Sequence, residues 1–382
     1  MLHIALKTLF GHYGKVIGMV VGLAVASLMM TQQPATMLSV LSRIYSFIED
    51  VSQPDIWVMD PMVQFVDDAK PLADSKLGLV RSVTGVAWAV PIFKTVTTAR
   101  LPDGNTAGAQ LVGVDDSSLI GAPALMEIGH TSDLRRTDAV FVNDEGANLR
   151  FAQKQPDGTM RPLRVGEILE LNEHRAEVVG IAKTGPTFSS QPVIYTTYTR
   201  AKLYAPPVRK TMSFVLAKAK PGLNPEQLAR EITRQTGLAA YTAAEFKDKS
   251  LWYFIKNTGI LVMFGTMTLV GFVVGAVVSG IMFFNFTQDN LRHFAVLKAI
   301  GATPGQLLAM VLTQASIIGV IGYGIGIGLA SIMAMSSSTF QVKFTNSLLA
   351  FSATGVLLIC LFSAGISMLK VLRLEPGEVF KG

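Results

Sequence analysis

Four long runs without a charged residue dominate the pattern of hydrophobic and polar positions along the chain. They cover residues 16–42, 257–288, 299–342 and 344–369. A bilayer core of about 30 Å needs roughly 20 helical residues, so each run is long enough to cross a membrane. Lipid offers no hydrogen-bond partner to a peptide group, so a spanning run must be helical. The pattern therefore predicts four membrane-spanning helices.

The third run has 44 residues and could in principle hold two spans. Its middle, GVIGYGIGIGL at residues 319–329, offers no polar turn, and its polar breaks lie at its two ends, GATPG and SSST. We therefore predict one tilted helix over residues 306–335, and a fourth span over residues 346–369.

The basic residues in the short segments orient these helices. Seven of them lie on one side of the predicted spans and a single one on the other: Lys7, Lys15, Arg292, Lys298, Lys370, Arg373 and Lys381 against Lys343. Cytoplasmic flanks are richer in Lys and Arg. The predicted cytoplasmic parts are therefore residues 1–15, 289–305 and 370–382, and the predicted outer parts are residues 43–256 and 336–345.

Composition agrees with a membrane protein that carries one large domain outside the bilayer. Half of the residues are hydrophobic and only 16% are charged. Residues 43–256 contain 25 Lys and Arg against 24 Asp and Glu. No basic patch interleaved with aromatic residues is present, so the sequence does not predict a nucleic-acid partner.

The sequence pattern predicts that the large domain is an α+β layer with a β-rich insertion. Strand-like PDIWVMD, an amphipathic helix near residues 71–83 and two strands around the turn PDGNTA form its first part. A strand, a Pro-Gly turn and a helix entered through Asn224 and Pro225 form its last part. Between them, residues 119–207 hold short alternating strands, which we interpret as a separate inserted module.

The sequence lacks the motifs of the common catalytic classes. No Gly-x-x-x-x-Gly-Lys-Ser/Thr nucleotide-binding loop and no Gly-x-Ser-x-Gly elbow occurs. The five histidines lack metal-ligand spacing, and the single cysteine, Cys360, lies inside the fourth span. The spans carry no charged residue for an ion relay. We therefore expect neither an enzyme nor a secondary transporter, and no cofactor or metal held by this chain.

The polar interruption between the second and third runs, RHFAVLKAIGATPGQL, predicts a short amphipathic helix. Leu291, Phe294, Leu297 and Ile300 follow one face, Arg292 and Ala295 lie opposite, and Lys298 lies at the border. Gly301 can end the helix, and Pro304 suits the first turn of the next one. Such a helix is either a docking element or an interfacial connector.

Two motifs resemble a known family. FAVLKAIGATPGQL is similar to the E-x-G-x-x-[KR]-A-[LI]-G-A-[ST] loop of the MacB/LolC/FtsX group of ABC-transporter permeases, although His293, Phe294 or Ala295 replaces its acidic residue. The tail resembles that group's terminal P-x-[ED]-[AV]-[LIF] through Pro376, Glu378, Val379 and Phe380. Within that group, the chain is most similar to the DevC-type permeases, because it has no fused ATPase. The resemblance implies four spans with a large extracytoplasmic domain between the first two.

The resemblance also implies a mechanical role in a bacterial inner membrane. A pair of permease chains, expected to be a homodimer among membrane lipids, would bind separate cytoplasmic ABC ATPases that hold ATP and Mg²⁺. The contact with the ATPase would be made by Arg292, Phe294, Leu297, Lys298, Ile300, Gly301 and Ala302. Outside, a periplasmic membrane-fusion protein and an outer-membrane channel would follow.

The sequence also allows two other functions. One is a transmembrane regulator of the FtsX kind, which activates an extracytoplasmic hydrolase without transport. The other is a membrane-anchored enzyme or sensor whose outer domain binds a ligand.

Overall fold

The computed structural model describes residues 8–9, 13–156, 158–336 and 344–372, and it divides the chain into two compact units. We call residues 1–39 with 259–382 the helical unit and residues 40–258 the α+β unit. One helix, α2 (Tyr13–Asp50), begins in the first unit and ends in the second. It continues for eight residues beyond the charge-free run 16–42.

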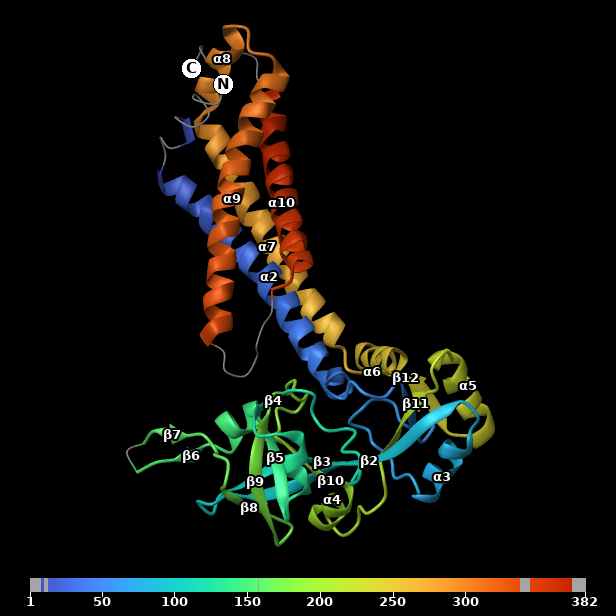
Figure 1. Cartoon of the computed structure of the whole chain (residues 1–382). Coiled ribbons are helices and arrows are strands. Elements are labelled where there is room, and N and C mark those ends of the chain that lie inside the picture. Colours follow the sequence, from blue (N-terminus) through green and yellow to red (C-terminus); the bar gives the residue numbers. More distant parts are fainter. Residues whose placement is uncertain (1–7, 10–12, 157, 337–343, 373–382) are drawn as a thin grey trace. The chain divides into compact units, whose positions relative to one another are not determined.

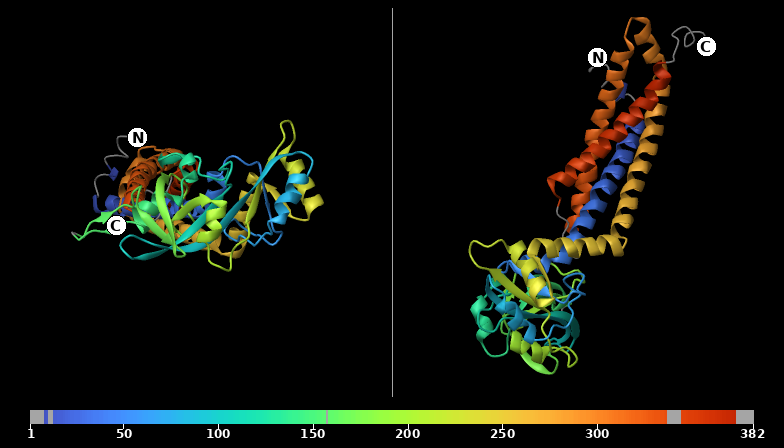
Figure 2. Two further views of the ribbon diagram at one scale, coloured as in Figure 1. Left: turned by 60° about the horizontal axis from the view of Figure 1, so that its bottom comes forward. Right: turned by 90° about the vertical axis from the view of Figure 1, so that its right-hand side faces the viewer.

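The helical unit holds the four long apolar helices that the sequence predicts. Figures 1 and 2 show them side by side, with the short helix α8 (Leu291–Ala299) at one end of the bundle. All four are long and apolar enough to cross a membrane, and the chain is a multi-pass membrane protein. They are α2, α7 (Ile260–Asp289), α9 (Pro304–Ser336) and α10 (Asn346–Leu372). The long third run contains one helix, α9, of 33 residues.

Glycines allow the long helices to approach one another closely. A Cβ atom added to Gly275 of α7 would lie 2.2 Å from the Cβ of Ala26 in α2. One added to Gly326 of α9 would lie 2.6 Å from the carbonyl oxygen of Ala24, again in α2. Small residues at such contacts let helix backbones pack closely where lipid provides no hydrophobic driving force. The glycines in the middle of α9 therefore pack it against α2.

We expect Gly326→Leu to disrupt the bundle and Gly328→Leu, two residues away on α9, to be tolerated. A side chain at Gly326 would overlap Ser27 and the backbone of Ala24, whereas nothing lies within 4 Å of a Cβ added to Gly328. Thermal unfolding of the two purified variants in detergent measures the difference. Equal melting temperatures would show that the α2–α9 contact does not need glycine.

The α+β unit is built on a mixed sheet whose ten described strands share pairings from end to end. Its order is β12, β1, β11, β2, β3, β10, β5, β9, β4, and β8 pairs with both β2 and β9. The bounds are β1 (Ile56–Met59), β2 (Val86–Arg100), β3 (Thr106–Val114), β4 (Met126–Ile128), β5 (Ala139–Asn143), β8 (Ile168–Leu171), β9 (His174–Ala182), β10 (Val193–Thr197), β11 (Phe214–Ala219) and β12 (Ala239–Thr242). A separate hairpin joins β6 (Gln153–Lys154) to β7 (Met160–Arg161).

One half of the sheet forms the predicted α+β layer. Two helices, α3 (Ser75–Ser82) and α5 (Pro225–Thr236), bury apolar side chains with β1, β2, β11 and β12 in one core cluster. Asn224 caps α5 by accepting a bond from the Glu226 amide at 2.8 Å, and Pro225 follows at the first helical position. A second cluster, which continues into the other half of the sheet, joins Trp57 and Phe214 to Phe246 of α6 (Ala243–Asn257) and to Phe47 near the end of α2.

The other half of the sheet closes into a barrel, which corrects the predicted limits of the β-rich module. Strands β2, β3, β10, β5, β9 and β8 pair in sequence, and β8 pairs with β2 to complete the circle. The core inside the barrel contains Phe93 of β2, Leu111 of β3, and Val140 and Val142 of β5. The limits 119–207 leave out β2 and β3 and are therefore wrong. Closure needs every strand, and the 15-residue β2 belongs to both halves of the sheet, as Figure 1 shows.

Candidate functional site

The predicted coupling segment is a well-formed helix between two membrane helices. Asn290, which is buried, separates α7 from α8, and its side-chain amide donates to the carbonyl oxygen of Phe286 at 2.8 Å. The Asn290 carbonyl oxygen in turn accepts from the Phe294 amide at 3.1 Å. This turn satisfies the end of α7 and starts α8 within one residue.

The end of α8 and the start of α9 follow the signals in the sequence. Gly301 has a φ of +98°, and the next amide, that of Ala302, donates back to the Leu297 carbonyl oxygen at 3.0 Å. The Thr303 amide donates to the side chain of Gln306 at 3.0 Å, and the Gln306 amide donates to the Thr303 hydroxyl at 3.4 Å. This reciprocal cap, with Pro304 at the first helical position, begins α9.

The face that α8 turns toward the bundle differs from the prediction. Phe294 is 1% exposed and belongs to the core of the helical unit with Phe283, Phe286 and Leu307, and Ala295 beside it is fully buried. Phe294 therefore packs inside this chain's own bundle, and Ala295 does not lie on a solvent face. Of the predicted apolar face, Phe294 is thus buried in the bundle, Leu297 is half-buried and Ile300 is exposed.

The exposed face of α8 is made by other residues. Ile300 is 75% exposed, and Arg292, His293, Val296 and Ala299 are exposed with it. Of the remaining predicted residues, Leu297, Lys298 and Ala302 are half-buried and Gly301 is exposed. His293, Val296 and Ala299 are not among the residues that the sequence predicts for this site. The adjacent polar pair at positions 292 and 293 was the available signal, because it marks the solvent side.

An ion pair joins two helices of the bundle near the start of α8. Lys15 in the first turns of α2 pairs with Asp289, the last residue of α7. Both side chains are more than one-third exposed, so the pair contributes at most about 1 kcal/mol. Its position fixes the ends of two helices beside α8 without adding reactive chemistry.

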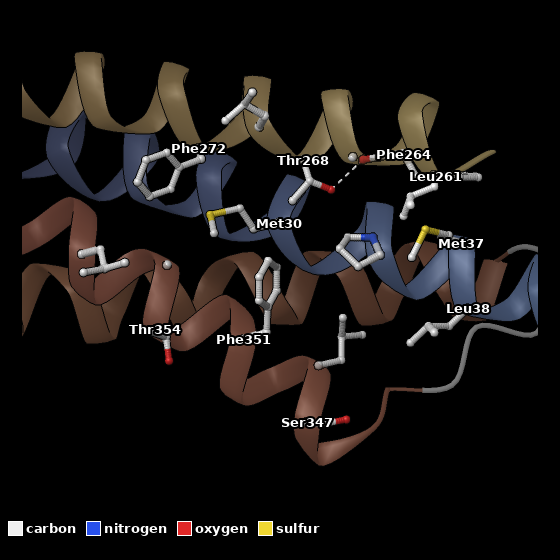
Figure 3. Close-up of a pocket in the computed structure, with 16 residues that line it drawn as sticks. Met30, Met37, Leu38, Leu261, Phe264, Thr268, Phe272, Ser347, Phe351 and Thr354 are labelled. Atoms are coloured by element: carbon white, nitrogen blue, oxygen red, sulfur yellow. Dashed lines mark hydrogen bonds between the residues drawn. The ribbon is translucent and has the colours of Figure 1, made fainter. Parts of the chain in front are cut away.

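A separate apolar pocket of about 630 Å³ lies within the helical unit between α2, α7 and α10. Figure 3 shows Met30, Phe272 and Phe351 facing it from these three helices. The hydroxyl of Thr268 donates to the Phe264 carbonyl oxygen of its own helix at 2.8 Å, so this donor needs no acceptor from a molecule in the pocket. The residues that line the pocket include none that titrates. The pocket therefore suits an apolar molecule, and its lining residues offer no group for acid–base chemistry.

No metal centre is found among the described residues. Within the ranges given above, no three His, Cys, Asp or Glu side chains come together as metal ligands. Cys360, buried in α10, is a free thiol. The described residues thus form an exposed helix face, an apolar pocket and a large α+β unit.

Comparisons with known proteins match both units. The model for the MacB-like periplasmic core domain matches residues 16–235, which is more than half of the chain, and the model for the FtsX-like permease C-terminal region matches residues 260–376. No curated protein matches the sequence.

Two solved structures are similar to parts of the chain. One is the extracellular domain of the noncanonic ABC-type transporter YknZ from Gram-positive bacteria, with 16% identity, 50% of this chain and 98% of that chain covered, and a TM-score of 0.34. The other is the periplasmic region of MacB from Actinobacillus actinomycetemcomitans, with 11% identity, 55% and 96% covered, and a TM-score of 0.37.

Proposed function

Because the chain belongs to the MacB/FtsX-type family of ABC-transporter permease subunits, we propose that it couples ATP hydrolysis by a separate cytoplasmic ATPase to movement of its α+β unit. Family membership implies an ABC ATPase as partner. The proposal adds that ATP-driven closure of that ATPase displaces the long helices, and that the displacement does work outside the membrane instead of opening a channel through it.

The observation that carries the proposal is the construction of α8. Phe294 and Ala295 fix one side of the helix in the bundle core, and Ile300, Val296 and Arg292 are left exposed on it. A force applied to that exposed face is passed directly to α7 and α9, because α8 joins them through two tight turns. An exposed isoleucine beside basic residues suits a contact with an apolar centre and a polar rim.

The finer assignments extend this proposal. Two permease chains would form a homodimer in the bacterial inner membrane with both termini in the cytoplasm, and ATP and Mg²⁺ would bind only to the ATPase. The site residues would be Arg292, Ile300 and Gly301, with Leu297, Lys298 and Ala302 at the margin. In this arrangement the chain itself is not catalytic.

Partners outside the membrane decide between export and regulation. A tagged chain, solubilised in mild detergent and isolated from its native host, should carry an ABC ATPase together with a membrane-fusion protein, as identified by mass spectrometry. Recovery of a cell-wall hydrolase in place of the fusion protein would favour the FtsX-like regulator. A folded chain that carries no ATPase would contradict both forms of the proposal.

A further inference from the structure

The loop between β9 and β10, residues 183–192, is held by the last two turns of α2. Arg43 donates to the Ser190 hydroxyl at 2.8 Å, and the Ser46 hydroxyl donates to the Pro186 carbonyl oxygen at 3.0 Å. The Gly185 amide donates to both carboxylate oxygens of Asp50, at 3.0 and 3.1 Å. Positions 43, 46 and 50 follow one face of a helix, so α2 presents a continuous polar edge to this loop.

Packing brings the loop backbone directly against the helix. A Cβ atom added to Gly185 would lie only 2.6 Å from the Cβ of Ser46, so even alanine would force the two elements apart. Ser190, on the same loop, has a φ of +50°, an uncommon conformation for a residue with a side chain. The bond from Arg43 helps to hold it there, since such a conformation persists only where its surroundings impose it.

The same loop also contacts α6, the helix that leads through Thr258 and Gly259 into α7. The ring of Phe188 packs on that of Phe254 in α6 at a centroid distance of 4.8 Å. Phe254 in turn packs edge-on against Phe65 at 4.9 Å. Both chain segments that connect the α+β unit to the membrane helices therefore meet residues 183–192.

Toward the barrel, the loop has little freedom to absorb a displacement. Thr187 and Gln191 close it with two bonds of 2.9 Å, one in each direction. The Pro192 carbonyl oxygen accepts from the Gln110 amide of β3 at 2.8 Å, and the Val193 amide donates to Asn143 of β5 at 2.8 Å. These bonds connect the loop to three strands of the barrel, because β10 itself begins at Val193.

The charges around this junction are few. Glu49 pairs with Lys247 of α6 across a short contact. Burial raises the pKa of the Glu145 carboxyl; the nearby charge of Arg43 opposes this rise and that of Asp144 adds to it. Burial also raises the pKa of the Tyr195 hydroxyl in β10, and the nearby Asp50 adds to the rise. Asp50 thus stands close to both the loop and the strand that follows it.

We propose that residues 183–192 are the element through which movement of α2 and α6 reaches the barrel, with Ser46, Asp50 and Gly185 as its positioning residues. This inference rests on the proposed function. It adds that the barrel moves because this loop is attached to both connecting helices, rather than because the whole α+β unit follows as one passive body.

The test compares two variants of the junction with matched controls. Gly185→Ala forces the loop from Ser46, and the double variant Gly185→Ala with Ser46→Gly removes the clash again. The control is Gly78→Ala, since nothing lies within 4 Å of a Cβ added to Gly78. Asp50→Asn removes one of the two acceptors for Gly185, and Asp248→Asn, exposed on α6, is its control.

The readout is the distance between spin labels on Thr106→Cys in β3 and Lys256→Cys in α6, in a Cys360→Ala background, with the chain bound to its ATPase. We expect ATP with vanadate to shift this distance in the parent protein and both controls. Gly185→Ala and Asp50→Asn should lose at least half of the shift while retaining ATPase binding and hydrolysis. Adding Ser46→Gly to Gly185→Ala relieves the clash but removes the bond from Ser46 to Pro186, so it should restore part of the shift. Melting temperatures separate loss of coupling from loss of fold.

Two outcomes would overturn the inference in distinguishable ways. If the parent protein shifts and Gly185→Ala and Asp50→Asn shift equally, the loop does not transmit the movement, and the proposed function stands. If the parent protein binds a hydrolysing ATPase and shows no shift between these two labels, which both lie in the α+β unit, the barrel does not move relative to α6 and the inference fails. The proposed function is then tested separately, by whether nucleotide changes the α+β unit as a whole.

Discussion

Replacing Ile300 by aspartate is expected to release the ATPase from the purified chain without unfolding the chain. Ile300 is 75% exposed in the helical unit, so a charge there costs the isolated fold little. In a complex, the same charge would be buried without a partner in the apolar centre of the contact. Such burial costs several kcal/mol, which corresponds to a loss of roughly 100-fold or more in affinity.

The measurement is co-purification of the ATPase in detergent, followed by titration in nanodiscs. Ile128→Asp is the matched control, because Ile128 is 52% exposed and lies in the α+β unit. We expect it to retain the ATPase at the level of the unmodified chain. If Ile300→Asp retained the ATPase equally well, α8 would be a connector and the docking face would have to lie elsewhere.

Truncating Phe294 is expected to weaken the fold itself. This side chain is 1% exposed and packs in the cluster that contains Phe283, Phe286 and Leu307. Replacing a buried phenylalanine by alanine costs about 3–5 kcal/mol, because apolar contacts are lost and a cavity remains. Phe294→Ala should therefore melt well below the unmodified protein in detergent and give less monodisperse material.

Phe362→Ala is the control for that experiment. Phe362 in α10 is 70% exposed, so the same truncation leaves no internal cavity. The two variants should differ clearly in melting temperature. Equal melting of both would contradict the assignment of Phe294 to the core and would make it available again as a docking residue. Together with Ile300→Asp, this pair separates folding from docking on one nine-residue helix and the residue that follows it.

The helical unit was largely predictable because its elements depend on local composition. Charge-free runs longer than 20 residues leave few alternatives to a spanning helix. The turns around α8 were also predictable, since Gly301 and Pro304 act on the backbone at their own positions. The tail motif at Pro376, Glu378, Val379 and Phe380 lies outside the described residues, as do Lys7 and Lys343, on which part of the topology prediction depends.

The orientation of α8 was not predictable from its periodicity. Its sequence has apolar residues on two faces, Phe294 with Ala295 on one and Val296 with Ile300 on the other. Which face is buried depends on α7, α9 and the start of α2, and a helical wheel contains none of them. A smaller difference occurs in α3, which begins at Ser75 rather than near residue 71 and buries Val80, whereas Leu79 is 45% exposed.

The barrel could not be delimited from local patterns either. Its closure depends on β2 pairing with β8, with Ala99 opposite Leu171, and on β3 running parallel to β10. These partners are about 70 to 80 residues apart in the sequence, and strand pairing over such distances leaves no local signal. Turn residues placed the strand ends well, but β2 and β3 both precede residue 119 and still pair with strands of the barrel.

The most direct test of the account is whether nucleotide on the ATPase changes the α+β unit. Hydrogen–deuterium exchange of backbone amides should be compared in the intact complex with and without ATP and vanadate. Mechanical coupling predicts altered exchange in α8 and also in residues 183–192 of the α+β unit. Altered exchange in α8 with none anywhere in residues 40–258, while the ATPase is trapped, would contradict mechanical coupling.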